Sequence, residues 1–302
     1  MTDERAPAPN HPRVSIGLPV YNGSRYLAAA LDSLLGQTFA DFELIICDNA
    51  STDDTQAICG NYAARDPRIR YIREPANTGA VRNHNRTIEL ARGEFFKWAA
   101  HDDVYAPQFV ERCVRHLDAH PETVLAFSRT RFIDQDGTPL AEYPHPLNLA
   151  SPSRGERFLG YVCANHVMVE DYGLVRTDVL RQTPLLGNFV WSDMVLFGEL
   201  ALYGPFFEVP EILFFRREHP QRAMQANRDA KSLSEWNDPR KSGGSIAPTW
   251  RALREYLAAL FRAPLTVGER AGLIIGTVKR GYWTGSLPRE LGDVARLALH
   301  RR

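Results

Sequence analysis

Three aspartates in the first half of the chain directly follow segments that are expected to be buried strands. Asp48 ends the apolar run 43–47, and the pair Asp102-Asp103 follows the run 94–100. The carboxyl ends of parallel strands form the sheet edge at which ligands bind. Two adjacent carboxylates there suit a hard divalent cation, which shares its remaining ligands with substrate phosphates. The alternative is that each aspartate caps the following helix, because Asp is a favoured N-cap residue.

The alternation of short apolar runs with amphipathic segments predicts how these carboxylates are positioned. Strands are expected at 14–18, 43–47, 69–73, 94–100 and 123–128. The intervening helices are expected at 24–35, 55–64, 81–91 and 107–120. This rhythm predicts an α/β fold with a mainly parallel sheet flanked by helices. In such a fold Asp103 is expected to be a solvent-facing loop carboxylate that contributes little to stability.

The second half of the chain is expected to be less regular. Beyond residue 131 the alternation breaks, and a helix is expected at 190–203. Two closing strands are expected at 206–209 and 212–215. The domain is therefore predicted to span 13–228.

The two ends of the chain differ in composition from this domain. Residues 1–12 contain no apolar signal segment and are expected to form a disordered leader. The polar segment 229–249 is expected to be a linker or mobile loop, and 250–302 a C-terminal helical appendage. Its three short amphipathic helices are expected at 250–262, 267–280 and 288–300.

The C-terminal region is also basic. Residues 231–302 carry 13 Lys or Arg and 6 Asp or Glu, a net charge of +7. A basic tail behind an acidic body predicts an anionic surface or partner. The apolar side of these helices is expected to be either an interfacial membrane contact or a packing or homodimerisation element.

Composition excludes several classes of protein. The 36 basic residues balance 36 acidic ones, so no nucleic-acid partner is expected, and no apolar run approaches the ~18 residues of a transmembrane helix. The turn Pro19-Val-Tyr-Asn-Gly23 after the first strand lacks the Gly-x-Gly-x-x-Gly of nicotinamide enzymes. The cysteines are too widely spaced for a disulfide framework or a metal knuckle and fit a reducing cytoplasm: Cys47, Cys59, Cys113 and Cys163.

Several short motifs occur in an order that resembles the family 2 glycosyltransferases. They are Pro19-Val-Tyr-Asn22, the segment 42–48, Asn77-Thr-Gly79, Gly93-Glu-Phe-Phe before Asp102-Asp103, Trp191-Ser-Asp193 and 214–219. The resemblance runs from about residue 13 to residue 222. It implies the Rossmann-like GT-A fold, a nucleotide-diphospho-sugar donor and inversion of the anomeric carbon. It also divides the domain into a nucleotide-sugar half, 13–130, and an acceptor half, 131–228.

The resemblance assigns binding roles to residues of the first half. It places nucleotide contacts on Pro19, Tyr21, Asn22, Asp48 and Asp102. It makes Asp103 the direct ligand of Mn²⁺ or Mg²⁺, with Asp102 and His219 as further candidates. The sequence departs from the family at His101, where another acid is common, and at Asn49-Ala50, where Asp-Gly usually follows the first aspartate.

The resemblance places the general base in the second half. Asp193 matches the second acid of the family's Glu-Asp element, with Ser192 in place of the glutamate. The alternative is that Ser192 is an N-cap and that the helix dipole favours Asp193. No role is assigned to Arg216, Arg217, Asn165 or His166, and Asn85 is open between a functional and a structural role.

The predicted function is inverting transfer of a sugar from a UDP- or dTDP-sugar to an acceptor hydroxyl, with a divalent metal and Asp193 as base. The setting would be bacterial polysaccharide or glycoconjugate synthesis in the cytoplasm. Two alternatives stay open. One is a transferase at the inner membrane face that acts on a lipid-linked acceptor, and the other is a non-catalytic nucleotide-sugar-binding module. The acceptor itself is not readable from the sequence.

Overall fold

The computed structural model of the chain describes residues 11–144, 147, 149–164, 166–222, 230–239 and 248–283. Most of the expected leader, the helix expected at 288–300 and Asn165 lie outside these residues. Nearly all the helices and strands expected from the sequence are present in these described residues. The division into domains at 228 and 250 stays a prediction.

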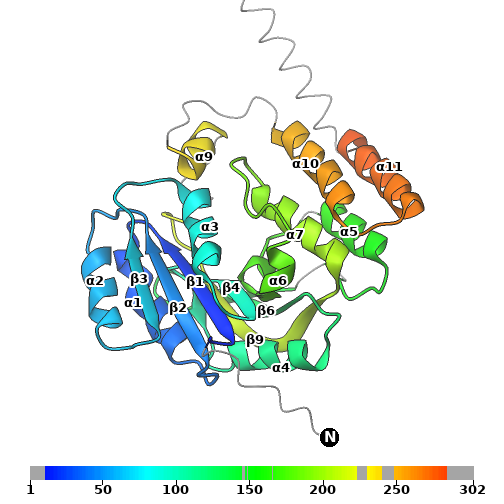
Figure 1. The fold of residues 1–302 in the computed structure, drawn as a ribbon. Coiled ribbons are helices and arrows are strands. Elements are labelled where there is room, and N and C mark those ends of the chain that lie inside the picture. Colours follow the sequence, from blue (N-terminus) through cyan, green and yellow to red (C-terminus); the bar gives the residue numbers. More distant parts are fainter. Residues whose placement is uncertain are drawn as a thin grey trace, which may run out of the picture.

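Within the described residues, nine strands form one sheet in the order β3-β2-β1-β4-β8-β6-β9-β5, with β7 paired to β6 (Figure 1). The strands are β1 (Val14–Val20), β2 (Phe42–Asp48), β3 (Ile69–Arg73), β4 (Phe95–Trp98), β5 (Val104–Tyr105), β6 (Leu125–Ile133), β7 (Pro139–Tyr143), β8 (Leu174–Arg176) and β9 (Phe206–Arg217). In the first half, β1 pairs in parallel with β2 and β4, and β2 with β3. Every residue of β1 and β2 is buried, as expected of parallel strands covered on both faces.

The second half adds the antiparallel pairs. The short β8 lies between β4 and β6 and runs antiparallel to both, whereas β6 and β9 are parallel. The two closing strands expected at 206–209 and 212–215 are one strand, β9, with an irregular register between them. The predicted α/β class is confirmed, and the sheet is mixed because its second half departs from the βαβ rhythm.

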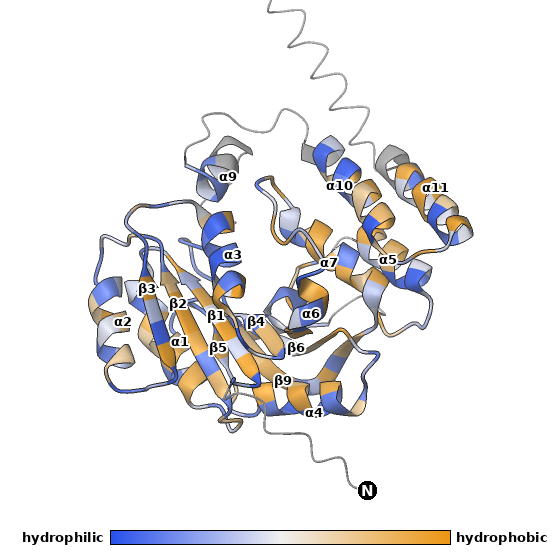
Figure 2. Cartoon of the chain, viewed as in Figure 1, coloured by the Kyte–Doolittle hydropathy of each residue, from blue (hydrophilic) through white to orange (hydrophobic). Residues whose placement is uncertain are grey.

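Helices cover both faces of the sheet. On one face, α1 (Ser24–Leu35), α2 (Thr55–Ala63) and α4 (Phe109–Ala119) pack on the side of β1 that carries Ile16 and Leu18. On the other face, α3 (Ala80–Leu90), α6 (Thr177–Leu180) and α7 (Ser192–Tyr203) pack with the side of the sheet that carries Phe96. Figure 2 shows the strands largely in the apolar colour and many hydrophilic positions on the helices.

The C-terminal helices form an appendage on the second half. α10 (Pro248–Arg262) and α11 (Val267–Trp283) share a buried apolar cluster with α5 (Arg154–Cys163) and α7. The expectation of a linker over 229–249 needs correction in its first part, because α9 (Ala230–Asn237) lies there and its end packs against Gly79. A polar sequence is no obstacle to a short helix that gains a tertiary contact.

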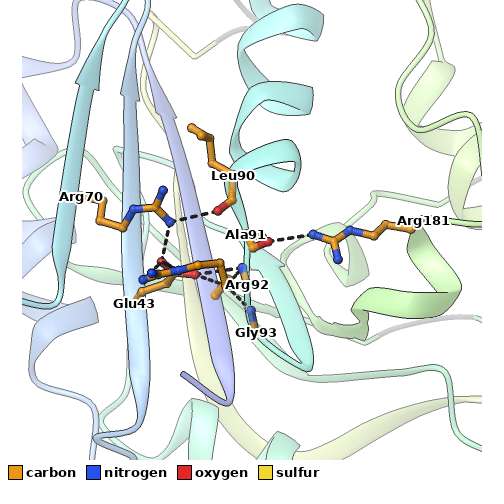
Figure 3. Close-up of polar contacts among 8 residues, drawn as sticks. Glu43, Arg70, Leu90, Ala91, Arg92, Gly93 and Arg181 are labelled. Atoms are coloured by element: carbon orange, nitrogen blue, oxygen red, sulfur yellow. Dashed lines mark hydrogen bonds and ion pairs between the residues drawn. The ribbon is translucent and has the colours of Figure 1, made fainter. Parts of the chain in front are cut away.

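A buried carboxylate holds the amino-terminal edge of the sheet together. Glu43, at the start of β2 and 3% exposed, accepts hydrogen bonds from Ser15 Oγ at 2.7 Å, Arg70 Nη1 at 2.7 Å and Arg92 Nη2 at 2.8 Å. Figure 3 shows the two guanidinium groups converging on it, while Arg181 reaches the Ala91 carbonyl oxygen from the other side. Burial by itself would raise the pKa of Glu43, but the hydrogen bonds from Arg92, Arg70 and Ser15 outweigh it and lower the pKa.

We expect Glu43→Gln to lower the free energy of unfolding by about 1.5–3 kcal/mol, because it removes the charge that several donors share. The matched control is Glu142→Gln, since Glu142 also pairs with two arginines, Arg129 and Arg131, but is exposed. The free energy of unfolding of Glu142→Gln should fall by less than about 1 kcal/mol. Urea unfolding at pH 7 measures both. Because the pKa of Glu43 is lowered on folding, its contribution should vanish as the pH falls below that pKa, and equal losses in the two variants would contradict this account.

Candidate active site

The carboxyl edge of the sheet begins with two interlocked turns after β1 and β2. Asn22 and Ala50 have positive φ angles of 51° and 61°. Asn22 Oδ1 accepts a hydrogen bond from the backbone N–H of Thr52 at 2.8 Å, and the N–H of Asn22 donates to Ser51 Oγ at 2.9 Å. Backbone conformations of this kind collect at ligand-binding sites, where the surrounding structure holds them in place. The two turns therefore form one rigid unit.

The predicted nucleotide contacts lie on or beside these turns. Pro19 is buried in β1, and the Tyr21 side chain is 44% exposed. Asp48 is fully buried, and its carboxylate accepts hydrogen bonds from the Ser51 N–H and from Tyr71 Oη, both at 2.8 Å. Arg73 Nε lies 3.3 Å from the same carboxylate. Asp48 thus already holds the turn after β2, and its contact with a nucleotide base stays a prediction.

Asp102 and Asp103 meet the end of β9. The backbone N–H of Arg217 donates to Asp103 Oδ1 at 2.7 Å, and Arg217 Nε donates to the carbonyl oxygen of Asp102 at 2.9 Å. His219 Nε2 lies 2.9 Å from Asp102 Oδ2. Segments more than 110 residues apart in the chain are therefore joined at one point. The two aspartates and His219, which the resemblance grouped, do lie together.

The two aspartates differ in their electrostatic surroundings. Burial opposes ionisation of Asp102, but the hydrogen bond from His219 outweighs it and lowers the pKa of Asp102 to about 2. The same hydrogen bond raises the pKa of His219. Burial and the neighbouring Asp102 charge raise the pKa of Asp103 to about 7. The expectation that Asp103 faces solvent is therefore wrong: its side chain is fully buried because the strand β9 closes over it.

One oxygen of this pair, Asp103 Oδ2, is buried without a hydrogen-bond partner. Buried polar atoms in folded proteins almost always have a partner, so such an atom calls for an explanation. In the described part of the chain, no group of three or more His, Cys, Asp or Glu is arranged to hold an ion by itself. A cation here would take a hard carboxylate oxygen from the protein and need other ligands from a substrate.

Asp193 lies at the start of α7, as predicted. Its residue is exposed, its Oδ1 accepts a hydrogen bond from the Met194 N–H at 2.8 Å, and the protein packed around the carboxyl raises its pKa. The alternative of Ser192 as N-cap does not apply, because the buried Ser192 is already helical. Trp191 occupies the cap position with a φ of 69°.

Asn85 holds the loop that leads to Asp193. Its Nδ2 donates to the carbonyl oxygen of Leu186 at 2.8 Å, and the N–H of Leu186 donates to Asn85 Oδ1 at 3.2 Å. Asn188, in the same loop, donates to Asp238 Oδ2 at 2.7 Å. Asn85 thus makes a structural contact that joins α3 of the first half to the loop before α7, and a functional role for it stays a prediction.

Three of the residues without an assigned role lie in the described part of the chain and contact other segments of the protein: Arg216, Arg217 and His166. Arg217 Nη1 donates to the carbonyl oxygens of the turn at 134–135, each at 3.1 Å, and Arg216 Nη1 donates to the Met168 carbonyl oxygen at 2.8 Å. His166 Nε2 lies 3.1 Å from Glu170 Oε1. The two arginine contacts tie β9 to the segments beside it.

Sequence reasoning missed two groups that face this region. Asp171 has a buried oxygen, Oδ1, without a partner, and burial raises its pKa to about 8. Asp103 is the main charge that raises the pKa of Arg222, against the effect of burial. The adjacent acids Glu170-Asp171 within an otherwise apolar stretch were the signal available in the sequence.

The chain is similar in sequence to known proteins. Residues 15–182 match the family described as Glycosyl transferase family 2. The chain is 31% identical over 209 residues to chondroitin synthase of Escherichia coli, a match that covers 69% of this chain and 29% of that protein. The chain thus spans less than a third of that relative's length.

Two solved structures share the fold. TarS 1–349 of S. aureus, in complex with UDP-GlcNAc, matches with a TM-score of 0.63 at 17% identity, over 89% of this chain and 72% of that one. The mannosyltransferase PcManGT of Pyrobaculum calidifontis, in complex with GDP-Man and Mn²⁺, matches with a TM-score of 0.53 at 17% identity, over 97% and 88% of the two chains. At these identities the likeness shows the fold alone.

The burial of Asp103 predicts a stability gain when its charge is removed. The pKa of Asp103 is raised on folding, so the folded chain binds the proton more tightly and loses stability as the pH rises from about 4 to about 7. Asp103→Asn keeps an acceptor for the Arg217 N–H and should raise the melting temperature in EDTA by several degrees at pH 8, with little change at pH 4. Differential scanning calorimetry at both pH values checks this. A lower melting temperature for the variant at pH 8 would show that the charge is well compensated.

Proposed function

The chain belongs to glycosyl transferase family 2, and on that premise we propose that it transfers a sugar from a nucleotide-diphospho-sugar to an acceptor hydroxyl with inversion. The donor is a uridine or thymidine diphosphate sugar. The observation that carries the proposal is the junction of Asp102-Asp103 with Arg217 and His219, which leaves Asp103 Oδ2 buried and without a partner.

Asp103 is the residue that would hold a divalent cation, with His219 and Asp102 beside it. An ionised Asp103 is costly in this buried position, and an adjacent cation would favour the charged form. PcManGT, which shares the fold, is described in complex with GDP-Man and Mn²⁺. When bound, such a cation neutralises charge on the diphosphate leaving group.

The nucleotide is proposed to bind over the two turns after β1 and β2. The exposed ring of Tyr21 can stack on a base, and Asn22, Pro19 and Asp48 shape the surface beside it. TarS 1–349, of the same fold, is described in complex with UDP-GlcNAc. Asp48 has lone pairs beyond those used by its protein donors. Because it is fully buried, its proposed hydrogen bond to a base N–H requires the turn after β2 to open.

Asp193 is the proposed general base. It is exposed at the head of α7, on a different element from Asp103, and its raised pKa brings its basicity closer to neutral pH. A carboxylate there takes the proton of the acceptor hydroxyl as the oxygen attacks the anomeric carbon from the face opposite the diphosphate. One direct displacement inverts that carbon. The acceptor is proposed to be a saccharide or other glycoconjugate, in keeping with the E. coli relative's name.

We expect Asp193→Asn to lower kcat by ~10²–10⁴-fold while leaving donor binding unchanged, because only proton acceptance is lost. The matched control is Asp178→Asn, since Asp178 also begins a helix and accepts the next residue's N–H at 2.8 Å. A panel that includes UDP-GlcNAc and GDP-mannose first identifies the donor, and product release then measures kcat.

The pH profile provides a second readout of the same variant. In the wild type kcat should rise with pH as Asp193 ionises, through a pKa above the ordinary value for Asp. The kcat of Asp193→Asn should show no such rise. Near-normal turnover of Asp193→Asn, or a product with the donor's anomeric configuration by NMR, would refute the mechanism.

The role of Asp103 predicts metal-dependent product binding. We expect calorimetry to give an affinity for UDP or dTDP at least about tenfold higher with Mn²⁺ than with EDTA, because two carboxylates otherwise repel the diphosphate. Asp103→Asn should remove the difference, whereas Asp178→Asn should keep it. Equal affinities with and without Mn²⁺ in the wild type would remove the metal from the proposal.

A further inference from the structure

Within the described residues, the helix α11 packs against the other elements through one side only. Leu273 and Thr277 are buried, and Leu273 contributes to the apolar cluster that α5, α7 and α10 share. A Cβ on Gly276 would meet the side chain of Leu159 on α5, whereas a Cβ on Gly268 or Gly272 would meet no atom. In Figure 1, α11 lies at the edge of the molecule beside α10.

The opposite side of α11 is exposed and apolar. Val267, Ile275 and Val278 are 80%, 56% and 44% exposed and follow the spacing of one helix face. We define the outer face of α11 by the exposed residues that share this side of the helix: Val267, Gly268, Ala271, Gly272, Ile275, Val278 and Lys279. Glu269 is also exposed, but its place in the helical repeat is on the flank with Gly276 and not on this face. Its carboxylate accepts a hydrogen bond from Thr266 Oγ1 at the start of the helix.

The surroundings of this face are basic. The described segment 248–283 contains six Lys or Arg and two Asp or Glu, a net charge of +4. On α10, Arg251 and Arg254 share a single carboxylate, Glu255. Phe261, at the end of α10, is 65% exposed, with the Arg270 guanidinium 5.4 Å from its ring centre. Apolar and aromatic side chains between basic groups are the features of a helix that lies on an anionic membrane.

We propose that the outer face of α11, with Phe261, docks the chain onto the surface of an anionic phospholipid membrane. Within the described residues no helix could cross a bilayer, so the contact is with the interface. Apolar side chains enter the headgroup region there. Arg262 is paired with Glu199 outside the segment, and each of the other basic residues that reaches the surface adds attraction of about 1 kcal/mol.

Two features favour lipid over a second copy of the chain. A 17-residue helix is about 25 Å long, and one stripe along it offers much less than the about 800 Å² per partner of a stable protein interface. A second copy would also bring a second basic segment against the first. Binding to a membrane requires a smaller buried apolar area, because attraction between basic residues and anionic lipids adds to the binding.

Docking in this way would orient the acceptor half. α10 packs on α7, the helix whose first turn contains Asp193. The guanidinium of Arg251 on α10 also lies 5.1 Å from the ring centre of Phe189, in the loop before α7. The docking surface and the acceptor side thus belong to one packed unit. The surface goes beyond the proposed reaction and is independent of the identity of the donor.

The test is flotation of the full chain with vesicles of phosphatidylcholine alone and of phosphatidylcholine with phosphatidylglycerol. We expect binding to the anionic vesicles only, and a decrease with added salt. Ile275→Glu should weaken this binding about tenfold, because it places a charge where an apolar side chain enters the membrane. The matched control is Leu140→Glu, since Leu140 on β7 is 49% exposed, and this variant should bind like the wild type.

Three outcomes would overturn the proposal: no binding, equal binding to both kinds of vesicle, or full binding by Ile275→Glu. If light scattering shows that the wild type is a dimer and that Ile275→Glu is a monomer, the face is a contact between subunits instead. Circular dichroism and melting of each variant show whether it is folded, and Val278→Glu serves in place of Ile275→Glu if that variant is not. Transfer activity with soluble substrates is measured separately, so a failure of docking is distinguishable from a failure of the proposed reaction.

Discussion

The hydrogen bond from the backbone N–H of Arg217 to Asp103 is the contact on which the rest of the site depends. It joins the end of β9 to the segment after β4, across 114 residues of sequence. The parallel pairing of β6 with β9 and the antiparallel pairing of β5 with β9 set the register that makes it possible. Without that register, neither Arg217 nor His219 would reach the aspartates.

Two buried carboxylates at opposite edges of the sheet, Glu43 and Asp103, differ in how completely they are paired. Glu43 is paired with two arginines and a serine, so its charge is compensated and its pKa is lowered. Asp103 receives one backbone hydrogen bond, keeps an oxygen without a partner and has a raised pKa. This difference in pairing is the reason that the proposed cation site is placed on Asp103 and not on Glu43.

In the second half of the chain, one exposed carboxylate, Asp193, lies at the head of a well-packed helix. α7 is buried along most of its length between α5, α10 and the sheet, so its first turn is held rigidly. Asn85 fixes the preceding loop to α3 through Leu186. Asp193 is therefore placed by contacts from both halves of the chain, although the residue itself is open to solvent. The same packing carries α11, whose other side remains uncovered.

The amino-acid sequence by itself determined the elements of the first half and the aspartates at their ends, because strand and helix periodicity is a local property. It also determined family membership, through short motifs in a fixed order. It could not place β8 antiparallel between β4 and β6, bury Asp103 beneath β9, or pair Asn85 with Leu186. Those features were decided by the tertiary structure alone, because each arises from contacts between segments distant in sequence, whose partners and register no local pattern encodes.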